Sequence, residues 1–202
     1  FNIVKEICQN TELETIIQKI HSIEKDESNN DLNTLKFALI QISNLVSRVT
    51  HVPTANEISI FNSKINKIES LFSRCRMWLG DSREPIETSI SILQSVINKL
   101  ESTPSEKCVR LKEMINEKSY DYIICSTEDE AKALNCSLNT SVEKYRPQVI
   151  AVADVNDNLI TNRSLKAILI GWPKSNNINR ILSSFLFSEL TLLLYNFENK
   201  YY

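Results

Sequence analysis

The sequence predicts a protein in two parts, a helical part over residues 1–103 and a small α/β part over residues 104–202. Before position 103, apolar side chains recur at spacings of three and four, which is the pattern of amphipathic helices. After Pro104, short runs that are apolar at nearly every position alternate with helical segments. Such runs are typical of parallel strands covered on both faces, and their alternation with helices indicates βαβ units.

Four amphipathic helices are predicted in the front part. Pro53 ends the second helix, because proline removes a backbone donor and restricts the residue before it. Gly80 ends the third, since glycine enters the left-handed cap conformation without a steric penalty, and Pro85 fits the first turn of the fourth. Short loops between such helices indicate a bundle or a helical arm. The inner faces carry Ile3, Val4, Ile7, Leu13, Ile16, Ile17 and Ile20; Leu32, Leu35, Leu39, Ile42, Leu45, Val46 and Val49; Ile58, Ile65, Ile68, Leu71, Phe72 and Leu79; and Ile86, Ile90, Leu93, Ile97 and Leu100.

The back part is predicted to be a mostly parallel sheet flanked by helices. Ser105 is placed to cap its first helix, and the acidic residues after Thr127 suit the positive end of another helix. The predicted helices cover 107–118, 128–134 and 177–187, and the predicted strands cover 122–125, 149–153, 167–170 and 190–195.

Composition and charge narrow the classes of function. The chain has 202 residues, 42% of them hydrophobic, and a formal net charge of −2. These values are ordinary for a globular protein, and the basic excess typical of general nucleic-acid or membrane-surface binders is missing, although a local basic patch stays compatible with them. No stretch reaches the ~18 consecutive apolar residues of a membrane span, so we expect no membrane partner.

The cysteines and the start of the chain bear on its compartment. Five scattered cysteines without a C-x-x-C pair predict free thiols in a reducing, cytoplasmic setting. Charges interrupt the apolar residues of the opening stretch 1–6, which therefore does not look like a signal peptide. Because it also lacks an initiator methionine, we expect the chain to be part of something longer.

Several chemistries lack the residues that they need. Gly80 and Gly171 are the only glycines, so neither a phosphate loop nor a dinucleotide-binding turn can be built. His21 and His51 have no cysteine or carboxylate at metal-ligand spacing, and no nucleophile elbow is present. The sequence therefore predicts no catalytic constellation, no metal site and no cofactor within this segment, while leaving open whether the complete protein is an enzyme.

Candidate contact residues follow the predicted strands. Asp154 lies at the end of one strand, and Gly171 to Ser175, which includes Trp172 and Lys174, follows the next. Arg180 lies inside the helix after that. Ligand sites of open parallel sheets lie beyond the carboxyl ends of strands, so these residues are candidates for contact with a nucleotide or nucleic acid. The simpler interpretations are a solvated carboxylate, a turn with the tryptophan packed on the sheet, and a solvent-facing arginine.

In this order, the features resemble the second RecA-like domain of superfamily 2 helicases. Residues 107–134 resemble the opening of that domain, 151–155 resemble the strand and acidic residue of the fifth helicase motif, and 168–175 resemble the next strand and its turn. Arg180 takes the place of the first arginine of the sixth motif. Ser183 stands where an active helicase has the second arginine, and Leu182 stands where it has a glycine. The resemblance therefore implies a degenerate domain that does not complete an ATPase site.

A helical front joined to such a domain is also similar to bacterial anti-phage helicase-like proteins, in particular the DrmE family of DISARM defence systems. This resemblance implies a non-catalytic part in a nucleic-acid-processing assembly, with other protein subunits or domains and nucleic acid as partners. Two alternatives stay open. One is a protein–protein interaction module with a helical docking surface and a structural α/β half. The other is an enzyme with a small ligand site around Asp154.

Overall fold

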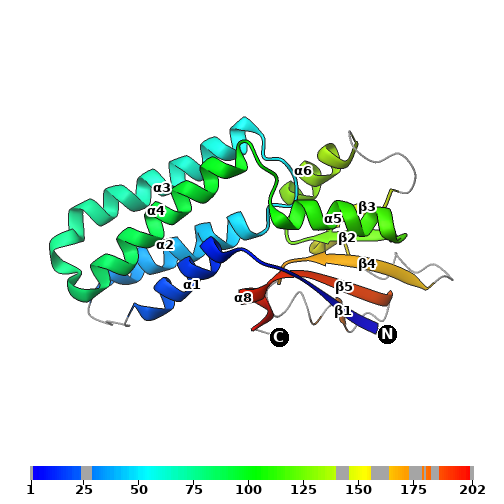
Figure 1. Cartoon of the computed structure of the whole chain (residues 1–202), viewed down its shortest axis with the longest axis horizontal. Coiled ribbons are helices and arrows are strands. Elements are labelled where there is room, and N and C mark those ends of the chain that lie inside the picture. Colours follow the sequence, from blue (N-terminus) through cyan, green and yellow to red (C-terminus); the bar gives the residue numbers. More distant parts are fainter. Residues whose placement is uncertain are drawn as a thin grey trace. The chain divides into compact units, whose positions relative to one another are not determined.

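The computed structural model describes residues 2–23, 29–139, 146–155, 164–172, 179, 181–182 and 187–200. The chain divides into two compact units (Figure 1). One holds residues 10–47 and 53–103, and the other holds residues 1–9, 48–52 and 104–202. The boundary between Thr103 and Pro104 thus coincides with the change of character in the sequence, but two earlier segments group with the back half.

The first unit is helical. Its helices are α1 (Thr11–Ser22), α2 (Asn30–Ser47), α3 (Ala55–Cys75) and α4 (Arg83–Leu100). Helix α1 packs against α2 and α4, and α3 packs against the same two helices. Asn10 caps α1, and Thr54 forms a capping box with Glu57 at the start of α3. Two short 3-10 turns, η1 (Arg76–Trp78) and η2 (Gly80–Ser82), join α3 to α4, and Gly80 has a positive φ of 49°. Two predicted helix ends were wrong: α2 ends at Ser47 and not at Pro53, and α3 ends at Cys75 and not at Gly80, because the chain continues from α3 into the 3-10 turn η1.

The second unit contains a five-stranded sheet in which all neighbouring strands are parallel. The strands are β1 (Asn2–Cys8), β2 (Tyr122–Cys125), β3 (Gln148–Ala151), β4 (Leu165–Ile170) and β5 (Phe187–Tyr195), in the spatial order β1-β5-β4-β2-β3. Helical elements within the described residues include α5 (Glu106–Glu117), α6 (Glu128–Asn139), the 3-10 turn η3 (Val152–Asp154) and α8 (Asn196–Asn199). The predicted fold class, a helical part joined to a parallel α/β part, is confirmed.

Both faces of the sheet are covered, as the uninterrupted apolar strands predicted. Helices α5 and α6 lie on the same face, α5 against β1 and β5 and α6 against β2 and β3 (Figure 1). Every second residue along the strands belongs to another hydrophobic cluster, which also includes residues from outside the sheet. Its members are Ile124, Ile150, Val152, Val155, Leu165, Ala167, Leu169, Ile181, Phe187, Leu190, Leu192 and Leu194.

Three predicted elements of the α/β unit need correction. Residues 2–8 form strand β1, which pairs with β5 from Asn2 opposite Glu189 to Cys8 opposite Tyr195, whereas the sequence predicted helix there. The apolar spacing of Ile3, Val4 and Ile7 fits a helix, but β-branched residues favour strands where a strand edge is available. Strand β3 ends at Ala151 rather than at 153, because the chain turns into η3. Strand β5 begins at residue 187, where the predicted helix was expected to end.

Candidate functional site at the carboxyl edge of the sheet

Open parallel sheets bind ligands beyond the carboxyl ends of their strands, at the point where the strand order reverses. Here the reversal falls between β2 and β4. From β2 the chain proceeds to β3 on one side, then crosses back to β4 and continues to β5 on the other side. The turns that follow these strands are therefore the candidate functional site, which we call the carboxyl edge.

The turn from β2 into α6 is closed by the side chain of Glu130. Its Oε2 accepts hydrogen bonds from the N–H groups of Ser126 at 3.0 Å and Thr127 at 3.3 Å. The Glu130 N–H donates in return to Thr127 Oγ1 at 3.2 Å, which completes a capping box. Free N–H groups at such a turn are the ones to which a phosphate binds in nucleotide-binding α/β proteins. In this chain a carboxylate already accepts from them.

The turn after β3 repeats this arrangement. Asp154 Oδ2 accepts a hydrogen bond from the Ala151 N–H at 3.3 Å, so the carboxylate caps η3. Asp154 is exposed and borders an open groove of ≈ 330 Å³ together with Glu128, Lys132 and Asn135 of α6. The hydrogen bond to Ala151 gives Asp154 a structural role, which is to cap the turn after β3.

The turn after β5 has a third carboxylate. Glu198 Oε2 accepts from the Tyr195 N–H at 2.7 Å and from Lys107 Nζ at 2.6 Å. The Lys107 side chain is 0% exposed and that of Glu198 is 11% exposed, so this is a buried ion pair. Lys107 Nζ also lies 4.5 Å from the centre of the Tyr195 ring, and the Tyr195 hydroxyl donates to Glu106 Oε2 at 3.1 Å.

The turn after β4 depends on a glycine. Gly171 has a φ of 66°, and its N–H donates to the Leu193 carbonyl at 3.0 Å. A Cβ at this position would lie 3.1 Å from Glu198 Oε1 and 3.8 Å from Lys107 Nζ. Glycine therefore provides both the left-handed backbone and the space for the buried ion pair.

The segment Arg48–Val52, which joins α2 to α3 in the chain, also lies at the carboxyl edge. Arg48 Nη1 is 3.9 Å from Glu130 Oε1, and Arg48 Cγ is 3.6 Å from the position of a Cβ on Gly171. The Val49 carbonyl accepts a hydrogen bond from Ser105 Oγ at 2.6 Å. These contacts place the segment over the ends of both β2 and β4.

Burial dominates the electrostatics of the carboxyl edge. It lowers the pKa of Lys107, although the Glu198 carboxylate opposes the shift. It raises the pKa of Glu130, opposed by Arg48, and it raises the pKa of the Tyr195 phenol. The pKa values of the Cys8 and Cys125 thiols are also raised by burial, so both remain protonated and poorly nucleophilic at neutral pH.

The arrangement fits structural ion pairs better than catalysis. A buried lysine with a lowered pKa can mark a functional site, but the Lys107 ammonium is bonded to Glu198 and faces the Tyr195 ring. All five cysteines are free thiols, and Cys136 is the exposed one. Within the described ranges, no group of three or more histidine, cysteine or acidic side chains could hold a metal ion.

Two of the five predicted contact residues fall within the described structure. Asp154 and Trp172 follow β3 and β4, so both lie at the carboxyl edge, as predicted. Trp172 is partly buried and packs against the hydrophobic cluster of the sheet, which agrees with the simpler interpretation of a turn with a packed tryptophan. Lys174, Ser175 and Arg180 lie outside the described residues.

Sequence reasoning missed the residues that fill the carboxyl edge. The T-x-x-E pattern of Thr127 and Glu130 could have predicted a capping box, but it was interpreted only as acidic charge near a helix dipole. Lys107 and Glu198 are 91 positions apart, and their pairing has no local signal. Arg48 fell inside the second predicted helix, which was expected to continue to Pro53, whereas α2 ends at Ser47, and no local pattern indicated that Arg48 lies at the sheet.

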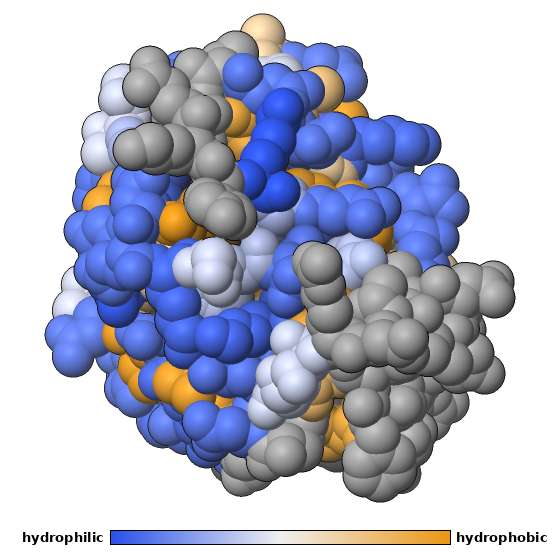
Figure 2. Space-filling model, turned by 90° about the vertical axis from the view of Figure 1, so that its right-hand side faces the viewer, coloured by the Kyte–Doolittle hydropathy of each residue, from blue (hydrophilic) through white to orange (hydrophobic). Residues whose placement is uncertain are grey.

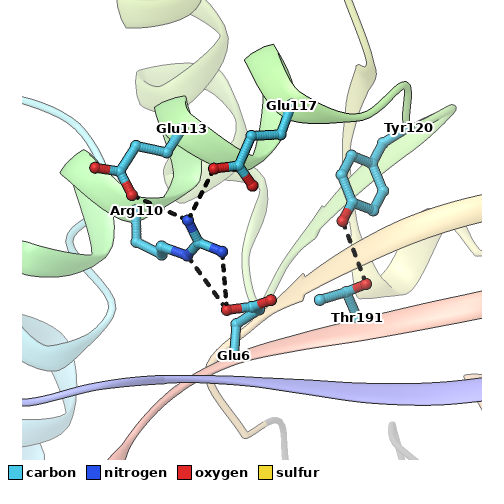
Figure 3. Close-up of polar contacts among 6 residues, drawn as sticks. All are labelled: Glu6, Arg110, Glu113, Glu117, Tyr120 and Thr191. Carbon is cyan, nitrogen blue, oxygen red and sulfur yellow. Dashed lines mark hydrogen bonds and ion pairs between the residues drawn. The ribbon is translucent and has the colours of Figure 1, made fainter.

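A second ionic cluster holds the edge strand β1 to α5 (Figure 3). Arg110 Nη2 is 3.1 Å from Glu6 Oε2 on β1, and Arg110 Nη1 is 3.0 Å from Glu113 Oε2 and 3.4 Å from Glu117 Oε1 on α5. The neighbouring carboxylates raise the pKa of Arg110 further. Because one arginine joins a strand to a helix, we interpret this cluster as a fastening of β1 rather than as a binding site.

None of the helices in the described ranges combines the length and apolar character of a membrane-spanning segment. Comparisons with known protein families, with curated proteins and with solved structures gave no match.

Proposed function

We propose that this chain is a non-catalytic, degenerate helicase-like domain of a nucleic-acid-processing assembly, in which the α/β unit no longer binds a nucleotide. The observation that supports the non-catalytic part is the state of the strand-end turns. After β2, β3 and β5, a carboxylate of the chain itself accepts from the N–H groups of the turn: Glu130, Asp154 and Glu198.

These carboxylates disfavour a polyphosphate for two physical reasons. The N–H donors that would bind phosphate oxygens are already used, so a ligand must first displace an internal acceptor. The same carboxylates place negative charge where the phosphates would lie, and like charges repel most strongly beside Glu130 and Glu198, which are 21% and 11% exposed. The missing glycine-rich loop acts in the same direction.

The nucleic-acid part of the proposal rests on the resemblance to the second RecA-like domain. An all-parallel sheet with Asp154 and Trp172 at one edge is compatible with that resemblance. The replacement of the second arginine by Ser183 supports a domain without ATPase activity. Membership of an anti-phage defence assembly is a narrower form of the same proposal.

Two titrations test the proposal. Calorimetry with ATP and Mg²⁺ should give no binding heat, and measurable nucleotide binding would refute the non-catalytic part. Fluorescence anisotropy with labelled single- and double-stranded DNA and RNA should show an affinity that falls steeply between about 50 and 200 mM salt, as phosphate contacts require. If none of these nucleic acids binds at low salt, the nucleic-acid part is wrong.

The second candidate function is a protein–protein interaction module, and one observation favours it. Met77 and Trp78, in the η1 turn between α3 and α4, are 90% and 78% exposed. Tryptophan and methionine are enriched at protein interfaces, and tryptophan is a frequent hot spot. By contrast, the face in Figure 2, at the end of the α/β unit where the strands begin, is mainly hydrophilic, with small separate hydrophobic areas among its described residues.

Double replacement of Met77 and Trp78 by alanine tests this second candidate. The change should leave the circular dichroism spectrum and the stability unaltered, since exposed side chains away from special contacts contribute little to folding. It should reduce the recovery of proteins that co-purify with the chain from its natural source. Unchanged recovery would remove the η1 turn as a docking surface.

A further inference from the structure

The segment Arg48–Val52 has an unusual environment for a connection between helices. It belongs to the α/β unit, although the helices on either side of it belong to the other unit. Val49, Thr50 and His51 are only 5%, 4% and 5% exposed. Connecting segments normally run over a protein surface, because burial leaves their backbone groups without water. This segment is therefore held in place by specific contacts.

Those contacts lie on the two strands that flank the reversal of strand order. Arg48 lies beside Gly171 at the end of β4 and is 3.9 Å from Glu130 in the turn after β2. The Val49 carbonyl is bonded to Ser105, the residue that also caps α5. Glu130 faces Arg48 and His51 from the segment, the N–H groups of its own turn, and the Cys125 thiol from β2.

We propose that Arg48–Val52 is a strap that closes the crevice at the reversal of strand order and keeps it inaccessible to ligands. The arginine supplies the positive charge that pairs with the partly buried carboxylate of Glu130, and the buried residues 49–51 of the strap fill the space at the strand ends. This proposal does not depend on the proposed function, because the closed crevice is a property of the fold whichever partner the chain has.

The strap also provides a means of coupling. It is the covalent link between α2 and α3, so any event that lifts it from the strand ends must change that connection as well. Conversely, loss of the Glu130 carboxylate should loosen the strap, which lies about eighty positions before Glu130 in the sequence. This long-range coupling distinguishes a strap from an ordinary buried loop.

Hydrogen exchange of the full chain, followed by mass spectrometry, tests the strap. Glu130→Ala should make the amides of residues 48–52 exchange roughly threefold faster or more. Glu128→Ala is the matched control, because Glu128 lies in the same first turn of α6 but pairs at 3.6 Å with Lys132 and is 68% exposed. The control should leave exchange of the strap unchanged.

A second variant makes the outcome decisive if Glu130→Ala does not fold. Arg48→Gln removes the charge of the strap, and the amides of residues 126–130 should then exchange faster. If Glu130→Ala leaves exchange of residues 48–52 unchanged, or if Arg48→Gln leaves exchange of residues 126–130 unchanged, the strap proposal is wrong. It is equally wrong if Glu128→Ala accelerates exchange in the strap as much as Glu130→Ala does.

Discussion

The buried pair of Lys107 and Glu198 permits the sharpest prediction about the stability of the α/β unit. Lys107→Met removes the ammonium but keeps most of the side-chain volume, and it leaves a carboxylate that is only 11% exposed without its cation. Removing one partner of a buried ion pair costs about 3–5 kcal/mol, because the remaining charge stays desolvated. We therefore expect Lys107→Met to destabilise the unit by about that amount.

The double variant Lys107→Met/Glu198→Gln separates the charge from the packing. Glutamine keeps an oxygen that can accept from the Tyr195 N–H, which is bonded to Glu198 at 2.7 Å, so the cap of the turn is preserved. Because replacing both members of a buried pair by neutral groups is often neutral or stabilising, the double variant should lie within about 1 kcal/mol of the wild type. The coupling energy between the two sites should then be at least about 2 kcal/mol.

Urea denaturation with tryptophan fluorescence measures these differences in one unit alone. The chain has two tryptophans, Trp78 in the helical unit and Trp172 in the α/β unit. In a Trp78→Phe background, fluorescence reports on Trp172, which packs against the hydrophobic cluster of the sheet. Unfolding free energies then follow from linear extrapolation, provided that the slopes agree between variants. If both single variants lose less than about 1 kcal/mol and their effects add, the pair is not the desolvated interaction described above.

Three further predictions concern the carboxyl edge and the strand beside it. Gly171→Ala should destabilise the α/β unit by more than the roughly 1 kcal/mol expected of Gly80→Ala. A Cβ at residue 171 would lie 3.1 Å from a carboxylate oxygen, whereas a Cβ at residue 80 would have no atom within 4 Å. Equal losses of stability in urea denaturation would contradict this prediction. Burial raises the pKa of Glu130, so its contribution to stability is fully present below the ordinary value of 4.5 and is lost as pH rises through the folded-state pKa. The stability of Glu130→Gln relative to wild type should therefore increase from about pH 4 to pH 7, and a constant difference would show that the carboxylate is not desolvated. Arg110→Ala should reduce the free energy of unfolding by about 1 kcal/mol and accelerate hydrogen exchange in β1, because its ion pair with Glu6 is lost. In the wild type, ~1 M salt should weaken the same ion pair and also accelerate exchange in β1. Unchanged exchange in β1 would contradict the interpretation of the cluster in Figure 3.

The sequence was sufficient for the elements whose signal is local. The helices from Asn30 to Leu100 were predicted because their apolar spacing, capping residues and prolines agree with one another. The parallel sheet was predicted because its strands are apolar on both faces. Strand β1 was not, because its apolar spacing is ambiguous and its partner, β5, lies at the other end of the chain.

The candidate site was predictable in location but not in content. The rule for open sheets pointed to the strand ends, and Asp154 and Trp172 are there. The interactions that fill the edge join residues far apart in sequence, such as Lys107 with Glu198 and Arg48 with Glu130. Helical periodicity gives no reason for Lys107 to be buried, because a lysine near a helix start is usually solvated. Only the tertiary structure brings it next to its carboxylate.

The scarcity of glycine and the carboxylates at the strand ends have a common physical explanation. Every strand that ends in a turn leaves N–H groups that need an acceptor. A glycine-rich loop exposes such groups closely enough for a phosphate to accept from them. In this chain an acidic residue three positions after the donor accepts instead, in the pairs Thr127–Glu130, Ala151–Asp154 and Tyr195–Glu198. A side-chain acceptor needs no close approach of the backbone to a ligand, so these turns can be built without glycine. The N–H donors of these turns are therefore satisfied by the chain itself, and this is the observation on which the proposed loss of nucleotide binding rests.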